Sequence, residues 1–167
     1  LMSLKTRIIN KASKKIVFVS DRLREGYIRK YGFSAAKSVT IYNGVDTRVF
    51  QPEKEDNIRK KLGLGPDHIL IGALGNIRPA KGYDLFLRAA RRIYDKHPEA
   101  RFLVAGQGSG ELYRNLLALR KELGLEDVFF FIGFCEDAVR VLNNLDIFVL
   151  PSTTEGFSIS TIEAMAC

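Results

Sequence analysis

The sequence is poor in the residues that build disulfides and metal sites. Its two cysteines, Cys135 and Cys167, cannot form a disulfide framework, and their scarcity fits a reducing compartment, so a cytoplasmic protein is expected. Neither a CxxC pair nor a cluster of His and Cys suggests a metal site. No apolar run approaches the roughly 18 residues of a membrane span. The charged N-terminus lacks the apolar stretch of a signal peptide.

Acidic residues are sparse in the first part of the chain. Residues 1–62 hold 15 Lys or Arg and 6 Asp or Glu, a net charge of +9, whereas residues 63–167 hold 11 and 13, a net charge of −2. The basic part could attract an anionic membrane, nucleic acid or an acidic partner, and it could equally be a solvated surface. Because no aromatic residues are interleaved with the cations for base stacking, nucleic acid is not expected as a partner.

Apolar runs and helical patterns alternate along the chain. The apolar runs predict strands at 16–20, near 39, and at 69–74, 101–105, 128–132 and 147–150. Helical patterns occupy 1–13, 21–31 with Asp21 as cap, 53–63, 83–96, 111–123, 136–144 and the segment from about 160. Asn43-Gly44 predicts a tight turn. Strands that alternate with helices predict an α/β fold with a Rossmann-like, doubly wound parallel sheet.

The strand order of such a sheet predicts where a ligand would bind. The strand at 69–74 should border the strand at 147–150, across the point where the winding reverses, and ligands bind off the carboxyl ends of the strands there. The loop that carries Arg78 and Lys81 should therefore face the loop that carries Glu155. Two cations beside a helix start favour a diphosphate.

Two carboxylates bracket the turn after the strand at 147–150. Glu155 precedes the helix that starts near residue 160, and Glu163 is expected in its first turn. The N–H groups at a helix start lack intrahelical partners, so they can bind phosphate or ligand oxygens, and the carboxylates can accept hydrogen bonds from sugar hydroxyls. In the alternative interpretation Glu163 only caps the helix and Glu155 is solvated.

The segment Glu155-Gly-Phe-Ser-Ile-Ser-Thr-Ile-Glu163-Ala-Met-Ala resembles the E-x7-E signature of the retaining glycosyltransferases of family 4, whose two Rossmann-like domains form the GT-B fold. The resemblance runs from about Ile16 to Cys167, and Asn43-Gly-Val-Asp46 is similar to the family's crossing between domains. It implies that residues 1–40 end the N-terminal domain, 41–66 form the crossing and 67–167 form the nucleotide-sugar-binding domain. It further implies a chain incomplete at both ends, which alone binds nucleotide weakly and turns over no donor.

The resemblance implies transfer of a hexose, with retention, from a nucleotide-diphosphate sugar such as a UDP- or GDP-sugar to a carbohydrate or lipid-linked acceptor. Polysaccharide or glycolipid biosynthesis in the cytoplasm, with peripheral contact at the inner face of an anionic membrane, is the expected setting. In the family pattern G-R-x4-K-G this chain keeps Gly75, Lys81 and Gly82, and has Asn76 in place of the arginine, with Arg78 as its substitute. Because the sequence has no Asp-x-Asp, donor binding without a metal or cofactor is expected.

The resemblance also assigns roles to individual residues. Glu155, Lys81 and Arg78 form the implied catalytic set, Glu163 binds the ribose, and Gly133 to Cys135 lie beside the base. The full implied donor-binding set is Asn76, Gly106, Gly133, Phe134, Cys135, Phe157, Ser158, Ile159 and Glu163. The backbone N–H groups of the Phe157–Ile159 segment, together with Glu155, are expected to hold the transferred sugar.

Other interpretations have weaker support in the sequence. Gly106-Gln-Gly-Ser-Gly-Glu111 has two of the three glycines of a dinucleotide fingerprint, but the third position is Glu111, and no acidic residue ends the following strand, so an NAD site is poorly supported. Neither His68 nor His97 ends a strand, and both are expected to be structural or solvated. The remaining alternative is a non-catalytic nucleotide-binding module or one that binds an anionic partner.

Overall fold

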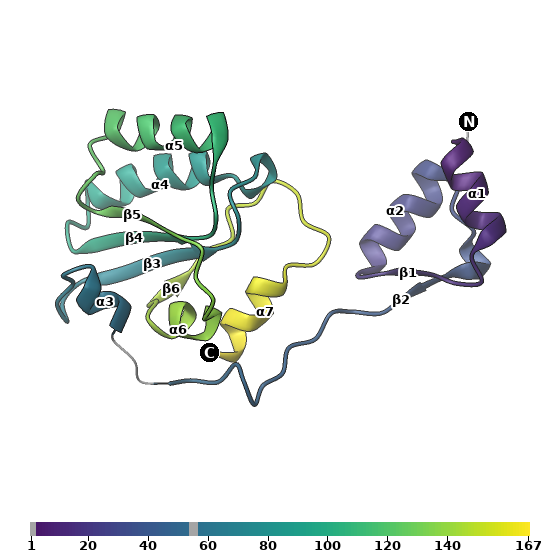
Figure 1. Cartoon of the computed structure of the whole chain (residues 1–167), viewed down its shortest axis with the longest axis horizontal. Coiled ribbons are helices and arrows are strands. Elements are labelled where there is room, and N and C mark those ends of the chain that lie inside the picture. The colour runs from purple at the N-terminus through teal and green to yellow at the C-terminus, as the bar shows by residue number, and fades with distance from the viewer. Residues whose placement is uncertain (1–2, 54–56) are drawn as a thin grey trace. The chain divides into compact units, whose positions relative to one another are not determined.

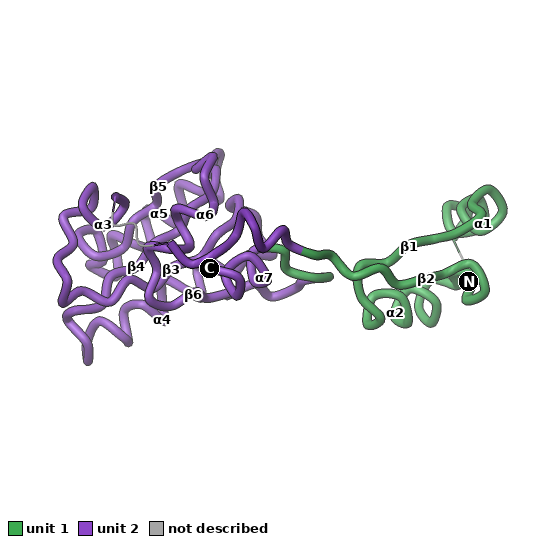
Figure 2. The backbone as a smooth tube through the Cα atoms, turned by 90° about the horizontal axis from the view of Figure 1, so that it is seen from below, with its two compact units in different colours: residues 1–44, 156–159 green, residues 45–155, 160–167 purple. Residues whose placement is uncertain are grey.

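The computed structural model describes residues 3–53 and 57–167 (Figure 1). They fall into two units, residues 1–44 with 156–159 and residues 45–155 with 160–167 (Figure 2). None of the helices in the described ranges is both long and apolar enough to span a bilayer.

The first unit is a two-stranded parallel sheet with helices. It comprises α1 (Leu4–Ala12), β1 (Ile16–Phe18), α2 (Asp21–Tyr31), the 3-10 turn η1 (Ala35–Lys37) and β2 (Ser38–Thr40). The cap of α2 is Ser20, whose Oγ accepts a hydrogen bond from the N–H of Leu23 at 3.3 Å, so the prediction that Asp21 caps this helix is wrong. The Asp21 carboxylate instead accepts from the hydroxyls of Thr40 and Tyr42, each at 2.7 Å, and ties α2 to the end of β2.

The segment 156–159 packs on the first unit. A Cβ built on Gly156 would lie 2.6 Å from Cδ1 of Leu23, so a side chain at 156 would collide with α2. The centroids of the Phe157 and Tyr42 rings lie 5.9 Å apart. This short segment therefore contributes to the first unit although it follows the last strand of the second in sequence.

The second unit is a doubly wound parallel sheet with the strand order β5-β4-β3-β6, in which the strands predicted at 69–74 and 147–150 are neighbours as expected. Its strands are β3 (Ile69–Leu74), β4 (Ala100–Ala105), β5 (Phe129–Gly133) and β6 (Ile147–Phe148). Its helices are α3 (Asn57–Lys61), α4 (Tyr83–Tyr94), α5 (Gly110–Glu122), α6 (Ala138–Asn143) and α7 (Ile159–Ala166), with the 3-10 turn η2 at Pro79–Lys81. α4 and α5 cover one face of the sheet, and α3 and α6 cover the other (Figure 1).

Alternate residues of the central strands fill two separate cores. Phe102 and Val104 of β4 pack under α4 and α5, whereas Leu103 and Ala105 pack toward α3 and α6. Side chains along a strand alternate between faces, so a strand covered on both sides must be apolar throughout. The predicted fold class is thus confirmed by the alternation of the buried residues.

Three local predictions are wrong. No turn forms at Asn43-Gly44. The turn lies further on, at Asp46, which accepts hydrogen bonds from the N–H of Arg48 on its carboxylate and from that of Val49 on its carbonyl. β6 is shorter than 147–150 and half-exposed, since within the described sheet it pairs only with β3. α7 begins at Ile159, which puts Glu163 in the second helical turn.

The predicted basic helix over 53–63 is partly outside the described residues. Residues 54–56 are not among them, and the described helix there is α3. The carbonyl of Gln51 and the N–H of Glu53 are both bonded to the side chain of Asn143, at 3.1 and 2.8 Å. The segment before α3 is therefore anchored to the end of α6.

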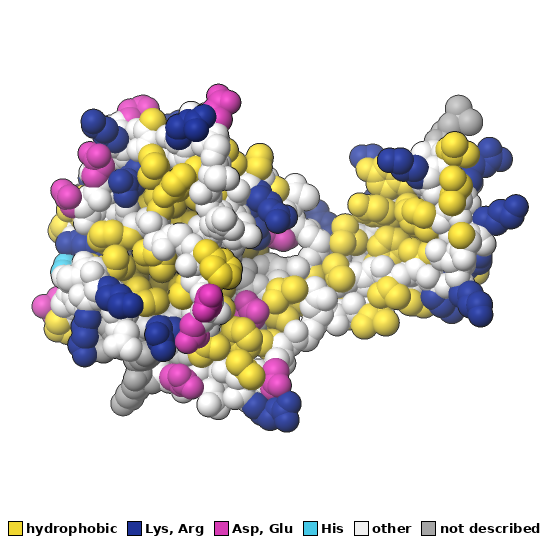
Figure 3. Space-filling model, viewed as in Figure 1, with side chains coloured by type: hydrophobic (Ala, Val, Ile, Leu, Met, Phe, Trp, Pro, Cys, Tyr) yellow, Lys and Arg dark blue, Asp and Glu magenta, His cyan; other side chains and the backbone are white. Residues whose placement is uncertain are grey.

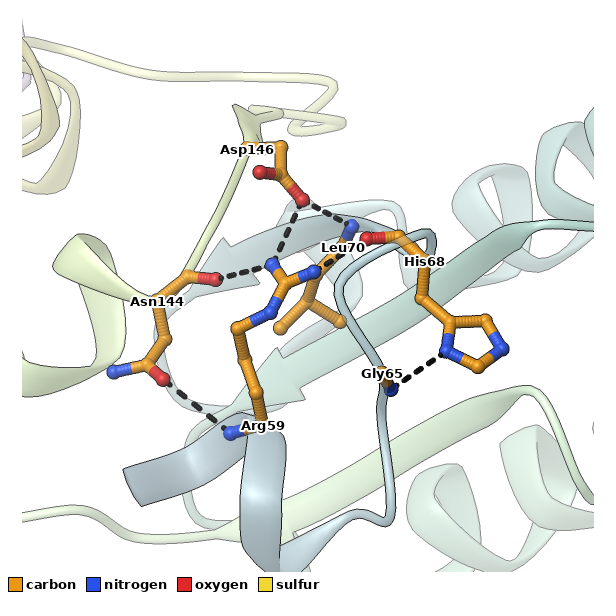
Figure 4. Close-up of polar contacts among 6 residues, drawn as sticks. All are labelled: Arg59, Gly65, His68, Leu70, Asn144 and Asp146. Carbon is orange, nitrogen blue, oxygen red and sulfur yellow. Dashed lines mark hydrogen bonds and ion pairs between the residues drawn. The ribbon is translucent and has the colours of Figure 1, made fainter. Parts of the chain in front are cut away.

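A cluster around Arg59 fixes the amino ends of β3 and β6 (Figure 4). The Arg59 guanidinium donates to Oδ2 of Asp146 at 2.8 Å, to the Asn144 carbonyl at 3.2 Å and to the His68 carbonyl. The same Asp146 oxygen accepts from the N–H of Leu70 at 2.7 Å. One side chain of α3 thus joins the starts of both strands, so the cluster supports the short pairing between them.

Replacing Arg59 by methionine should destabilise the protein by about 2 kcal/mol, because the half-exposed Asp146 and two carbonyls lose a charged donor. Arg48→Met is the matched control, since Arg48 pairs with Asp46 on the open surface and should change stability by no more than about 0.5 kcal/mol. Urea unfolding of both variants measures the difference. Equal, small losses would show that the cluster does not hold the strands.

Candidate functional site

The loops that follow β3, β4 and β5 are joined to one another at the carboxyl ends of the strands. The N–H of Gly75 donates to the carbonyl of Ala105 at 2.8 Å, and the N–H of Gly106 donates to that of Gly133 at 2.7 Å. A Cβ built on Gly106 would lie 2.0 Å from the Gly75 carbonyl oxygen, so only glycine permits this approach. We call this layer of loops, together with the loop after β6, the carboxyl edge.

Asn76 links two of these loops. Its Oδ1 accepts a hydrogen bond from the N–H of Gln107 at 3.0 Å, and the N–H of Ile77 donates to the Gln107 carbonyl at 2.8 Å. The side-chain oxygen is therefore used within the protein. At the position where the family pattern has an arginine, this chain has a residue that holds the loops after β3 and β4 together.

The loops after β3 and β6 meet in an ion pair. Nζ of Lys81 lies 2.8 Å from Oε1 of Glu155, and 23% and 28% of the two side chains are exposed. The N–H of Thr153 donates to the Ala80 carbonyl at 2.9 Å, and a Cβ on Gly82 would lie 2.2 Å from the carbonyl oxygen of the neighbouring loop at Pro151. The cationic loop thus faces the loop of Glu155, as the strand order predicts. The residues before and after Lys81 both contact the backbone of that loop, so the position of Lys81 in the chain is fixed.

The two carboxylates have opposite electrostatic environments. The hydrogen bond from Lys81 lowers the pKa of Glu155 below its ordinary value. Burial raises the pKa of Glu163, whose carboxylate has no hydrogen-bond or ion-pair partner within residues 3–53 and 57–167. Because Glu163 lies in the second turn of α7, it does not cap the helix. Glu155 is thus a fixed anion, and Glu163 is a half-buried carboxylate with free acceptor capacity.

Tyr83 belongs to the site although the sequence reasoning did not select it. Its side chain is only 3% exposed, and its hydroxyl donates to the carbonyl of Gly75 at 2.6 Å. Burial, and then the negative charge of Glu155, raise the pKa of Tyr83. In the sequence, only its position directly after Lys81-Gly82 points to the site. That position does not single out tyrosine, because an apolar core residue would fit the helical pattern equally well.

The other predicted site residues lie in different surroundings. Arg78 is exposed and has no ion-pair partner in the part of the chain that the structure describes. Phe134 is exposed, and Sγ of Cys135 donates to the Asp137 carbonyl at 3.4 Å. A hollow of about 240 Å³ is lined by Ile58, Lys61, Leu62, Ile132, Phe134, Cys135 and Arg140. It extends from the end of β5 toward α3 and α6, and neither Lys81 nor Glu155 lines it.

The remaining predicted residues, Phe157, Ser158 and Ile159, are part of the first unit. Ile159 is the first residue of α7, and Phe157 packs against Tyr42 there. Within the described ranges, no three His, Cys, Asp or Glu side chains gather where they could hold a metal ion. The carboxyl edge therefore joins Asn76, Lys81, Gly106, Gly133 and Glu155 within one unit.

The sequence matches the pattern of the glycosyl transferases of group 1 over residues 54–167. A D-inositol 3-phosphate glycosyltransferase of Mycobacterium sp. (strain JLS) is 32% identical over 166 residues, which are 96% of this chain and 37% of the relative. The O-antigen biosynthesis glycosyltransferase WclY of Escherichia coli is 32% identical over 150 residues, 90% of this chain and 40% of the relative. The chain thus spans about two fifths of the length of these relatives.

Solved structures show the same fold. Anabaena Alr3699/HepE in complex with UDP-glucose superposes with a TM-score of 0.89 at 23% identity, covering 97% of this chain and 45% of that one. The C-terminal domain of a group 1 glycosyl transferase (LpcC) from Francisella tularensis superposes with a TM-score of 0.64 at 33% identity, covering 74% of this chain and 66% of that one. Sucrose-phosphate synthase from Thermosynechococcus elongatus superposes with a TM-score of 0.82 at 24% identity, covering 98% of this chain and 41% of that one. The fold is therefore that of GT-B glycosyltransferases.

Glu155→Gln and Glu163→Gln should shift the melting temperature at pH 7 in opposite directions. The depressed pKa of Glu155 means that its ionised form stabilises the fold above the ordinary value of 4.5, so its loss lowers the melting temperature. The raised pKa of Glu163 means that its ionised form costs stability at pH 7, so its neutral replacement raises the melting temperature.

Both differences from the unmutated protein should shrink as the pH falls from about 7 to about 3.5, because Glu163 takes up its proton first in the folded protein and Glu155 takes up its proton first in the unfolded chain. Calorimetry at the two pH values measures the four differences, and each variant serves as the control for the other. A shift of the same sign in both variants at pH 7 would contradict the electrostatic assignment.

Proposed function

The chain belongs to the group 1 glycosyl transferases, and from this premise we propose that it forms the nucleotide-sugar-binding part of a retaining enzyme of family 4. The reaction transfers a hexose from a nucleoside diphosphate to an acceptor, with retention of the anomeric configuration. The bond between the anomeric carbon and the diphosphate oxygen breaks, and a bond from that carbon to an acceptor oxygen forms. Polysaccharide or glycolipid biosynthesis, in which the acceptor is a carbohydrate or is lipid-linked, is the proposed setting.

The observation that carries the proposal is the ion pair between Lys81 and Glu155 at the carboxyl edge. A cation that is held by loop contacts and is still partly exposed can reach an incoming diphosphate. When Lys81 turns to the phosphate oxygens, the Glu155 carboxylate is released to accept hydrogen bonds from the sugar. Lys81 then stabilises the negative charge that develops on the departing nucleotide.

Arg78 is proposed to supply the second cation. Asn76 carries no charge, and its oxygen is already bonded to the N–H of Gln107. Arg78 is exposed on the same loop, two positions later, and its guanidinium can bind phosphate oxygens bidentately. With two cations at the diphosphate, the proposed donor binding requires no metal ion.

The remaining contacts complete the proposed donor site. Glu163 accepts hydrogen bonds from the ribose hydroxyls, a role that fits a half-buried carboxylate with free acceptor capacity. The Gly133–Cys135 backbone lies beside the base, and the N–H groups of the Phe157–Ile159 segment bind the sugar. HepE binds UDP-glucose, which supports a UDP-sugar as the donor here, with a GDP-sugar as the other candidate.

The proposed domain assignment follows the family. Residues 1–40 end the N-terminal domain, residues 41–66 form the crossing and residues 67–167 belong to the nucleotide-sugar-binding domain. The acceptor would bind in the cleft between the two domains of such an enzyme. The proposed location is the cytoplasm, at the inner face of the membrane.

One observation favours a second candidate, a module that binds an anionic surface without catalysis. α1 buries Thr6 and leaves Leu4 and Ile8, one turn apart, 73% and 58% exposed. Lys5 and Lys11 lie on the same helix, and apolar side chains gather beside Lys and Arg on the first unit (Figure 3). Such a face fits an anionic lipid surface, and binding to anionic vesicles that falls steeply with salt would support this function.

The donor proposal predicts that UDP raises the melting temperature of the chain, with or without magnesium, and that Lys81→Met weakens UDP binding at least about tenfold. Lys96→Met removes an exposed lysine beyond the end of α4 and is the matched control. Uridine lacks the diphosphate, so both variants should bind it with the same affinity as the unmutated protein. Full UDP affinity in Lys81→Met, or binding of anionic vesicles with no response to UDP, GDP or ADP, would contradict the donor proposal.

A further inference from the structure

Tyr83 joins the protein core to the cationic loop. It is the first residue of α4, and its buried ring belongs to the same core as Ile71 and Phe86. Its hydroxyl lies at the edge of that core and donates a hydrogen bond to the Gly75 carbonyl at 2.6 Å. A phenylalanine would fill the same apolar space, so the hydrogen bond to Gly75 is what distinguishes tyrosine here.

Gly75 is the point at which this hydrogen bond can affect the ion pair. Its φ of 149° is a conformation that favours glycine, and its carbonyl is also the atom that Gly106 approaches closely. A Cβ built on Gly75 would lie 3.3 Å from Cε of Lys81, 3.4 Å from its Nζ and 3.4 Å from Oη of Tyr83. The ammonium of Lys81 and the hydroxyl of Tyr83 therefore pack on the same glycine.

We propose that Tyr83 is a positioning residue of the donor site, which holds the Gly75 peptide in the orientation that places the ammonium of Lys81 against Glu155. The inference rests on the proposed function, in which Lys81 binds the diphosphate. Without the hydroxyl, the Gly75 carbonyl loses its buried donor and the peptide turns toward another partner. The surface that supports Lys81 then moves, although the core keeps its shape.

Two features suit Tyr83 to this role. Burial and the charge of Glu155 raise the pKa of its phenol above the ordinary value, so the hydroxyl remains a protonated donor near neutral pH. Its ring is held by close-packed neighbours on α4 and the sheet, so the position of the hydroxyl is fixed by the core. The orientation of a partly exposed lysine is thus linked to a rigid part of the molecule.

The test is a double-mutant cycle on UDP binding, measured by calorimetric titration of the whole chain. Tyr83→Phe should weaken UDP about tenfold and leave uridine unaffected. In the Lys81→Met background the same change should cause no further loss, because Tyr83 acts through Lys81. Tyr94→Phe, at the other end of α4, is the matched control and should leave UDP affinity unchanged. Additive losses, or an equal loss for uridine, would overturn the proposal.

A second measurement needs no nucleotide and separates this inference from the proposed function. In the unliganded protein, carbon NMR of the carboxylates should show the pKa of Glu155 rising toward 4.5 in Tyr83→Phe, because the hydrogen bond from Lys81 weakens. Tyr94→Phe should leave that pKa in place. If the unmutated chain binds no UDP, the donor proposal fails, but this titration still decides whether Tyr83 positions Lys81. A Glu155 pKa that is unchanged in Tyr83→Phe would reject the role of Tyr83.

Discussion

The pairing of β3 with β6 is the constraint on which the site depends. It brings together two segments more than 70 residues apart, and it consists of only two residue pairs, Ile71 with Ile147 and Gly72 with Phe148. Gly72 leaves room there for Leu145, since a Cβ at this position would lie 2.5 Å from Cδ2 of Leu145 and would force that side chain to move. Arg59 and Asp146 reinforce the pairing at the amino ends of the strands, at the opposite end from the candidate site at their carboxyl ends. Stability and site geometry are therefore linked through one short contact.

At the carboxyl ends, glycines allow the loops to approach closely enough to hold charged groups in place. Gly106 meets the carbonyl of Gly75, and Gly82 meets that of Pro151, so neither position accepts a side chain. Lys81 is consequently anchored on a narrow loop rather than extended into solvent, and Glu155 is its ion-pair partner. Such preorganisation reduces the rearrangement needed when negative charge develops on a leaving group.

Much of this arrangement could be predicted from the sequence, because it follows from patterns that are local. Apolar runs located the strands of the doubly wound sheet, and the strand order then placed Lys81 opposite Glu155. The errors arose where tertiary contacts decide. The turn forms at Asp46 rather than at Asn43-Gly44, and α7 begins at Ile159 rather than near residue 160, which moves Glu163 out of the first turn. Tyr83 was missed because its hydrogen bond to Gly75 joins a core residue to a loop, and no spacing reveals it.

In the proposed function, Lys81 exchanges its bond to Glu155 for one to the donor's diphosphate. A crystal structure of the chain with UDP bound would test it most directly. We expect Nζ of Lys81 to lie within hydrogen-bond distance of a phosphate oxygen and away from the carboxylate of Glu155, with the uridine ring beside Gly133–Cys135. UDP bound elsewhere, with the Lys81–Glu155 pair unbroken at 2.8 Å, would contradict it.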